Sequence, residues 1–203
     1  MLSVIKKDLL MNYRFVLFTI IYSIAVPILI HVDGDKKYWM ISVLLPIINV
    51  GFIVGKATYI EDSEEVQVFL KSLPIKYSVI VLSKYVQAGA ILILTHIYAV
   101  LIEYYYMHSL NSILLGNLFS LSVYLLYFSV YFYLYYRKNY FYAQNSIYFL
   151  LVIGFALYFI FGKSLKITVS IQDISIYWFV ILDLVALVVF AISYRLSLRA
   201  KRG

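Results

Sequence analysis

Long uninterrupted runs of apolar residues constrain the fold of this chain more than any other feature of its sequence. A helix that crosses a bilayer needs about 20 mostly apolar residues, because it rises about 1.5 Å per residue and the hydrocarbon core is about 30 Å thick. Six stretches meet or approach this length, and only short polar joints separate them. The sequence therefore predicts an all-α membrane protein with six transmembrane helices at about residues 15–30, 38–59, 79–106, 113–136, 141–161 and 174–194.

The composition supports this class and argues against others. Hydrophobic residues make up 64% of the 203 and charged residues 13%, and the mean hydropathy is +0.91, which is more apolar than one soluble core of this size needs. The chain has no cysteine, so we expect neither disulfides nor a thiolate metal site. No second domain is visible, and we expect residues 1–203 to form a single transmembrane domain.

The positions of the basic residues predict that both termini lie in the cytoplasm. With the N-terminus inside, all but four of the 17 Lys and Arg residues fall on the cytoplasmic side. Lys and Arg are enriched in cytoplasmic loops, so the net charge of +7 reports orientation and not a nucleic-acid partner. The four basic residues expected outside are Lys36, Lys37, Lys163 and Lys166.

The expected cytoplasmic segment between the second and third spans contains four of the ten acidic residues of the chain. Asp62 with Glu65 predicts a capped helix start, and Pro74 disfavours helix at the residue before it. Apolar residues at i, i+3, i+4 and i+7 predict a short amphipathic helix at residues 63–72. A helix led by acids suits a protein partner better than an anionic lipid surface. The candidate partner-binding residues are Asp62, Glu64, Glu65, Val66, Phe69, Leu70, Leu73 and Pro74.

The first 14 residues predict a second amphipathic helix, which lies on the membrane surface. Three apolar residues share one face, and three basic residues point elsewhere, toward lipid phosphates. The apolar residues are Leu2, Ile5 and Leu9, and the basic residues are Lys6, Lys7 and Arg14.

The sequence predicts no catalytic, nucleotide, cofactor or metal site. A phosphate-binding loop needs four residues between its glycines and a hydroxyl after its lysine. Here three residues separate Gly51 from Gly55, and Ala57 follows Lys56. We interpret the two glycines as a small-residue pattern that allows close helix packing. The three histidines do not have the spacing of zinc ligands.

Two acids lie inside predicted spans and are candidates for a substrate pathway. Carboxylates in lipid are costly, and Glu103 and Asp183 are therefore functional candidates, together with His96, two turns before Glu103. Structural roles are the alternative: Glu103 would reach the outer interface, and Asp183 would hydrogen-bond to a neighbouring helix.

The chain contains 22 Tyr and 14 Phe residues. Many of them lie between Tyr124 and Tyr142, where an aromatic belt at the headgroup level is expected. There are more rings than a belt requires, so we also expect some of them to line a cavity for an amphipathic or lipid-like substrate.

The stretch FLKSLPIKYSVIVLSKY (Phe69–Tyr85), together with six spans, cytoplasmic ends and a basic N-terminal helix, resembles the small permease subunits of bacterial ABC-2 type transporters. The resemblance implies that residues 63–72 form a coupling helix that docks on a separate ABC ATPase subunit. That subunit would bind ATP and magnesium, so this chain would carry no cofactor and would not be an enzyme by itself. The matching residues are Leu70, Leu73, Pro74, Ile80, Val81, Lys84 and Tyr85.

The resemblance also implies a dimer with a second permease copy or a paralogue in the bacterial cytoplasmic membrane. We expect an exporter of hydrophobic or amphipathic peptides of the bacteriocin or cytolytic kind. Two alternatives stay open. One is an ion-coupled or proton-coupled secondary transporter or channel that uses Asp183, and the other is a toxin-immunity membrane protein that transports nothing.

Overall fold

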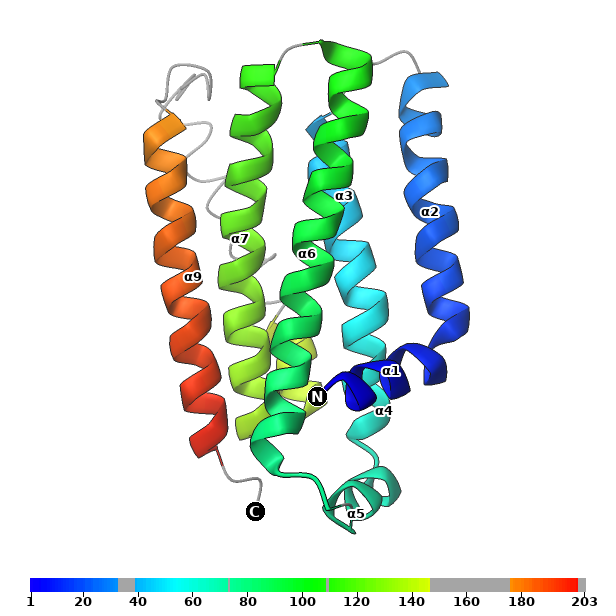
Figure 1. The fold of residues 1–203 in the computed structure, drawn as a ribbon, viewed down its shortest axis with the longest axis vertical. Coiled ribbons are helices and arrows are strands. Elements are labelled where there is room, and N and C mark those ends of the chain that lie inside the picture. Colours follow the sequence, from blue (N-terminus) through cyan, green and yellow to red (C-terminus); the bar gives the residue numbers. More distant parts are fainter. Residues whose placement is uncertain (33–38, 73, 109, 147–175, 201–203) are drawn as a thin grey trace.

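The computed structural model describes residues 1–32, 39–72, 74–108, 110–146 and 176–200, and these ranges are helical with short connections and no strand. Long helices lie side by side in a bundle (Figure 1). The all-α prediction is confirmed for this part of the chain. Five helices are long and apolar enough to cross a membrane: Tyr13–Val32, Ile41–Glu61, Tyr77–Met107, Ile113–Arg137 and Ile176–Arg199.

The described helix ends agree with the predicted spans to within five residues. The predicted fifth span, 141–161, lies mostly outside the described residues, so the sixth crossing stays a prediction; residues 140–146 are helical. The elements are α1 (Leu2–Met11), α2 (Tyr13–Val32), α3 (Trp39–Val50), the π-helix η1 (Gly51–Gly55), α4 (Lys56–Glu61), α5 (Glu64–Ser72), α6 (Tyr77–Met107), α7 (Leu110–Arg137) and α9 (Ile176–Arg199).

The short helix α5 marks one end of the bundle, which we call the α5 end (Figure 1). Helix α1 lies across this end, and the last residues of α9 lie there too. Helices α2 and α6 run away from the α5 end, whereas α3, α7 and α9 run toward it. The first and last described residues therefore share one side, in agreement with the predicted topology, and its assignment to the cytoplasm stays a prediction.

Helices α6, α7 and α9 share an apolar core near the α5 end, with Tyr85 at its centre. The ring centroid of Tyr85 lies 4.6 Å from that of Phe132 and 4.9 Å from that of Phe190. Its hydroxyl makes hydrogen bonds of 2.7 Å with Ser193 and 2.9 Å with Ser197. A buried tyrosine hydroxyl needs such partners, so these contacts fix α6 against α9.

Helices α2 and α9 have the largest exposed apolar surfaces of the bundle, whereas α3 and α7 are half-buried. Their exposed side chains are mostly Leu, Ile and Val, which water would not tolerate in such numbers. This surface is typical of a multi-pass membrane protein whose outer helices face lipid or another membrane chain.

Candidate functional site

Helix α5 lies beyond the ends of the long helices and begins one residue later than the sequence predicts (Figure 1). The carbonyl of Ser63 accepts the N–H of Gln67 at 3.0 Å, which makes Ser63 the N-cap residue. Asp62 instead follows the last residue of α4. The predicted capping pair of Asp62 with Glu65 is therefore wrong by one position, because the preceding span continues in helical form to Glu61.

The exposed face of α5 combines acids with apolar residues. Val68 is 68% exposed and Phe69 is 56% exposed, whereas Val66 and Leu70 are half-buried. The predicted docking face of Val66, Phe69, Leu70 and Leu73 is therefore split, and Leu73 lies outside the described residues. Positions i, i+1, i+4 and i+5 share one helix face. The face that is free for a partner consists of Glu64, Glu65, Val68 and Phe69, and Pro74 beyond the helix is also exposed.

Hydrogen bonds attach the start of α5 to the segment that follows α7. The Asp62 carboxylate accepts the N–H of Tyr140 at 3.2 Å, at the first residue of helix 140–146. An anion is favoured there because the start of a helix carries partial positive charge. The Gln67 amide donates to the Asp62 carbonyl at 3.3 Å, and the ring of Tyr59 packs edge-on against Tyr140 at 5.2 Å. The junction between α4 and α5 is thus held against the start of helix 140–146 by Asp62 and Tyr59.

A buried cluster of four charges lies just above α5 and joins α1, α4 and α6. Lys84 donates to Asp8 at 2.7 Å and lies 3.1 Å from Glu61. Lys7 donates to Glu61 at 2.8 Å and lies 3.1 Å from Asp8. We call Lys7, Asp8, Glu61 and Lys84 the ionic cluster.

The ionic cluster balances two cations against two carboxylates, and all of these side chains except that of Lys7, which is 27% exposed, are buried. The side chain of Lys84 is fully buried, and those of Asp8 and Glu61 are 2% and 5% exposed. Charges at such depth persist only when they are paired, since an uncompensated buried charge costs several kcal/mol. The cluster therefore makes the relative positions of α1, α4 and α6 depend on one another.

The Lys7 ammonium is part of this balance and does not face lipid phosphates. Its burial alone would lower its pKa, but the Glu61 and Asp8 carboxylates outweigh that effect and hold the pKa above its usual value. The prediction that Lys7 faces lipid phosphates is wrong, whereas Lys6 and Arg14 are exposed. One sequence signal could have revealed the cluster: Lys84 lies seven residues inside an apolar helix, where a lysine needs a counter-ion.

Glu103 and His96 belong to one polar seam between α6 and α7. The Glu103 carboxylate accepts the backbone N–H of Ser42, in the first turn of α3, at 3.0 Å and the Asn117 amide at 2.9 Å. His96 bonds to the Ser120 hydroxyl at 2.9 Å. Ser120 in turn donates to the Asn117 carbonyl, so one continuous chain of hydrogen bonds links both predicted residues.

Asp183 lies apart from this seam, between α7 and α9. Its Oδ1 accepts the Ser122 hydroxyl at 2.5 Å, and its Oδ2 is buried without a hydrogen-bond partner among the described residues. The structure therefore brings His96 and Glu103 together but places Asp183 on another side of α7. None of the three lines the separate pocket that lies between η1 and α7.

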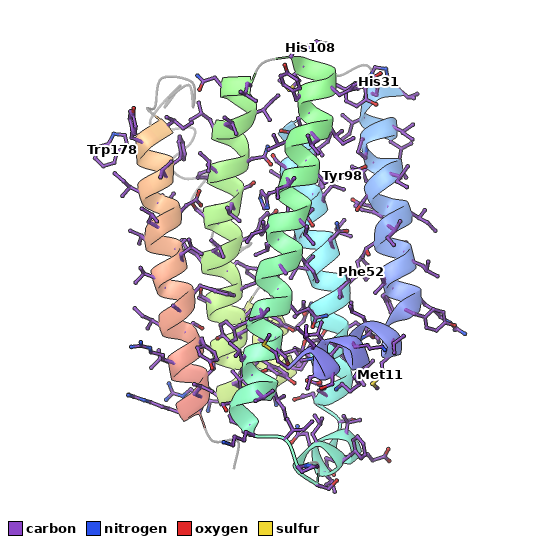
Figure 2. All side chains as sticks on the ribbon, in the orientation of Figure 1. Met11, His31, Phe52, Tyr98, His108 and Trp178 are labelled. Atoms are coloured by element: carbon purple, nitrogen blue, oxygen red, sulfur yellow. The ribbon has the colours of Figure 1, made fainter. Side chains whose placement is uncertain are left out.

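A pocket of about 360 Å³ lies between the end of α3, η1, α7 and helix 140–146, and Phe15 of α2 also lines it. Phe52 of η1, labelled in Figure 2, also lines the pocket and is partly exposed. Its ring centroid lies 5.1 Å from that of Phe18 of α2. Half of the described residues that line it are aromatic, and the basic residue among them is Lys56. The predicted cavity in the tyrosine-rich segment thus has a counterpart, since Tyr127, Phe128, Tyr131 and Tyr140 all line it.

The two glycines of η1 line this pocket and do not pack against another helix. A Cβ added at Gly51 or Gly55 would meet no neighbouring atom within 4 Å. The interpretation of the two glycines as a close helix-packing pattern is therefore wrong for the described part of the chain. Single π-helical turns interrupt α-helices frequently at functional sites, which directs attention to this wall.

The described residues contain no group of three or more His, Cys, Asp or Glu side chains that could hold a metal ion. In comparisons with known proteins, the sequence matches a family model described as "ABC-2 family transporter protein" over residues 3–200. No curated protein and no solved structure matches the chain significantly. The family match extends over α5, the ionic cluster, the polar seam and the pocket.

Proposed function

The chain belongs to the ABC-2 transporter family, and from this we propose that it is the membrane-spanning permease subunit of an ATP-driven exporter. The ATPase would be a separate cytoplasmic subunit that binds ATP and magnesium. Five membrane-length helices and the outward apolar surfaces of α2 and α9 support a permease embedded in the bilayer.

The observation that carries the coupling part of this proposal is the exposed face of α5. Val68 and Phe69 are exposed large apolar side chains on a helix that lies beyond the ends of the long helices (Figure 1). Glu64 and Glu65 precede them by one turn. An apolar pair beside two acids suits a protein groove that has an apolar floor and a basic rim. We assign this groove to the ATPase subunit, and the α5 end is then the cytoplasmic end.

The contacts at the start of α5 would transmit a movement of this helix to other helices of the bundle. Asp62 ties the base of α5 to Tyr140, and the adjacent Glu61 belongs to the ionic cluster with α1 and α6. Because Glu61 directly precedes Asp62 and pairs with both Lys7 and Lys84, a displacement of α5 by the ATPase would shift α1, α4 and α6 together. Packed elements of this kind move as units and do not deform continuously.

The proposed substrates are hydrophobic or amphipathic peptides, and the proposed partner in the membrane is a second permease copy or paralogue. The exposed apolar faces of α2 and α9 offer surfaces for such a partner. Within the bundle, the buried polar seam of His96 and Glu103 and the separate Asp183 are the candidate pathway groups.

The test is purification of the chain from its native membrane with the substitution Phe69→Asp in α5. The wild-type chain should retain an ABC ATPase, identified by its sequence and by ATP hydrolysis, and Phe69→Asp should lose it while still inserting. Tyr142→Asp is the matched control, because it adds the same charge to an exposed ring outside α5 at the same end. Equal recovery of the ATPase with both variants would remove α5 from the coupling role, and no ATPase with the wild type would overturn the permease proposal.

A secondary transporter that uses Asp183 is the second candidate function. The observation in its favour is the unpartnered buried Oδ2 atom of Asp183, which leaves one side of that carboxylate able to take a proton or ion. Proton-driven uptake by the purified chain in liposomes without any ATPase, abolished by Asp183→Asn, would establish it in place of the exporter. Absence of such uptake would exclude it.

A further inference from the structure

We propose that the pocket at η1 binds an anionic phospholipid of the surrounding bilayer, with one acyl chain inside the pocket and its phosphate at Lys56. This inference does not depend on transport or on an ATPase. It rests on the depth of the pocket, its wall, its volume and the charge at its mouth.

The pocket has the correct depth for a lipid in the leaflet at the α5 end. The apolar part of the second span begins at Ile41 and ends at Glu61. At a rise of 1.5 Å per residue, Gly51 lies about 15 Å and Lys56 about 22 Å along a hydrocarbon core of about 30 Å. The glycine wall is thus near the bilayer centre, and the Lys56 backbone lies about 8 Å inside the edge of the core. Its ammonium lies over the ring of Tyr59, one turn nearer the α5 end, and long lysine side chains reach toward the headgroups from such depths.

The wall suits an acyl chain. Its aromatic rings come from Phe15, Phe128 and Tyr131 among others, and the Tyr131 hydroxyl is already bonded to Thr58 at 2.7 Å. The two glycines add open space where other residues would place a side chain. A volume of about 360 Å³ lies at the lower limit of small-ligand pockets, so it holds one chain and not a whole peptide.

The positive charge of Lys56 in the pocket wall favours an anionic ligand. The Lys56 ammonium lies 4.3 Å from the ring centre of Tyr59 and 5.4 Å from that of Phe15, which hold it in place. It makes no ion pair with a carboxylate among the described residues. Gly51 and Phe52 are exposed, so the pocket can be reached from outside the bundle. The distribution of Lys and Arg predicts, independently of an ATPase, that the α5 end is cytoplasmic, and the cytoplasmic leaflet is rich in anionic lipid.

The experiment uses the full chain in nanodiscs with a photoactivatable lipid. The probe is phosphatidylglycerol with a diazirine near the end of one acyl chain, compared with phosphatidylcholine that carries the same chain. Peptides that contain Gly51–Lys56 or Tyr127–Tyr131 should carry the adduct. Its yield should be about fivefold higher for the anionic probe, the effect of one lysine near an anionic headgroup.

Three variants decide the outcome. Lys56→Gln should make the two yields equal, and Lys6→Gln, an exposed lysine at the same end, should preserve the fivefold preference. Gly51→Leu should lower both yields, because its side chain enters the pocket. Equal yields in the wild type, or an unchanged preference in Lys56→Gln, would overturn the proposal. If Gly51→Leu fails to fold, the comparison of the two lysine variants still decides it.

Discussion

Lys84 and Lys56 both lie within membrane-spanning helices near the α5 end, yet the protein treats their charges differently. Lys84 is fully buried and touches two carboxylates, which belong to α1 and α4. Lys56 is half-buried at the mouth of a pocket, touches aromatic rings, and has no carboxylate partner among the described residues. The contrast distinguishes a charge that holds helices together from a charge that is left for a ligand.

Removal of the Lys84 charge should have the largest effect. In Lys84→Met the carboxylates of Asp8 and Glu61 stay buried with Lys7 as their remaining cation, and the loss should be about 3–5 kcal/mol of unfolding free energy. Denaturant titration of the purified chain in detergent, followed by circular dichroism, would measure it. The double variant Lys84→Met with Asp8→Leu should recover part of the loss, because it removes one cation and one anion together. A loss below about 1 kcal/mol in the single variant would contradict a tightly paired cluster.

A smaller loss is expected when Glu61 is neutralised. Glu61→Gln leaves Asp8 to pair with both lysines, so the cost should be about 2 kcal/mol, the worth of charged hydrogen bonds. The same variant should loosen α1, since Lys7 loses its 2.8 Å partner. Hydrogen exchange of residues 2–11 would report that loosening, and exchange in α9 is the internal reference. Unchanged exchange in α1 would show that Glu61 does not hold this helix.

The long helices were predictable from sequence because each depends on its own run of apolar residues. The start and end of α5 were nearly predictable for the same reason, since Pro74 and the spacing of its apolar residues are local signals. The direction in which α5 presents its apolar residues was not predictable. Val66 and Leu70 turn partly toward the bundle and Val68 is exposed, which depends on how α5 is tethered through Asp62.

The ionic cluster and the pocket were beyond local patterns. Lys84 and Asp8 are 76 positions apart, and Lys7 and Glu61 are 54 apart, so their pairing arises only when α1 folds back across α6. The position of Lys84 inside an apolar helix signals that it needs a counter-ion, but no local pattern identifies the residues that supply it. The pocket at Gly51 was likewise not predictable from local sequence, because its walls depend on the π-helical turn and on the position of α7.

A substitution that places a carboxylate in the pocket should give Lys56 an internal counter-charge, as Lys84 already has. Gln144 lines the same pocket as Lys56, so Gln144→Glu adds an acid to the wall that also carries this cation. The labelling preference for anionic over zwitterionic lipid should fall about fivefold, because the internal acid replaces the phosphate. Photolabelling in nanodiscs would measure it, with Gln144→Met as the uncharged control. An unchanged preference would mean that the lipid phosphate does not bind at Lys56.

The smallest change in stability is expected at Lys56 itself. Lys56→Gln leaves no carboxylate unpaired, so it removes only the attraction between its ammonium and the Phe15 and Tyr59 rings. An attraction of this kind is worth about 0.5–1 kcal/mol at exposed sites, several-fold less than the loss expected at Lys84. The two variants should be compared in the same denaturant titration and in a bilayer without anionic lipid, so that a bound phosphate does not stabilise the wild type. A loss at Lys56 as large as that at Lys84 would mean that Lys56 too has an internal counter-charge, and that the pocket is closed to an outside anion.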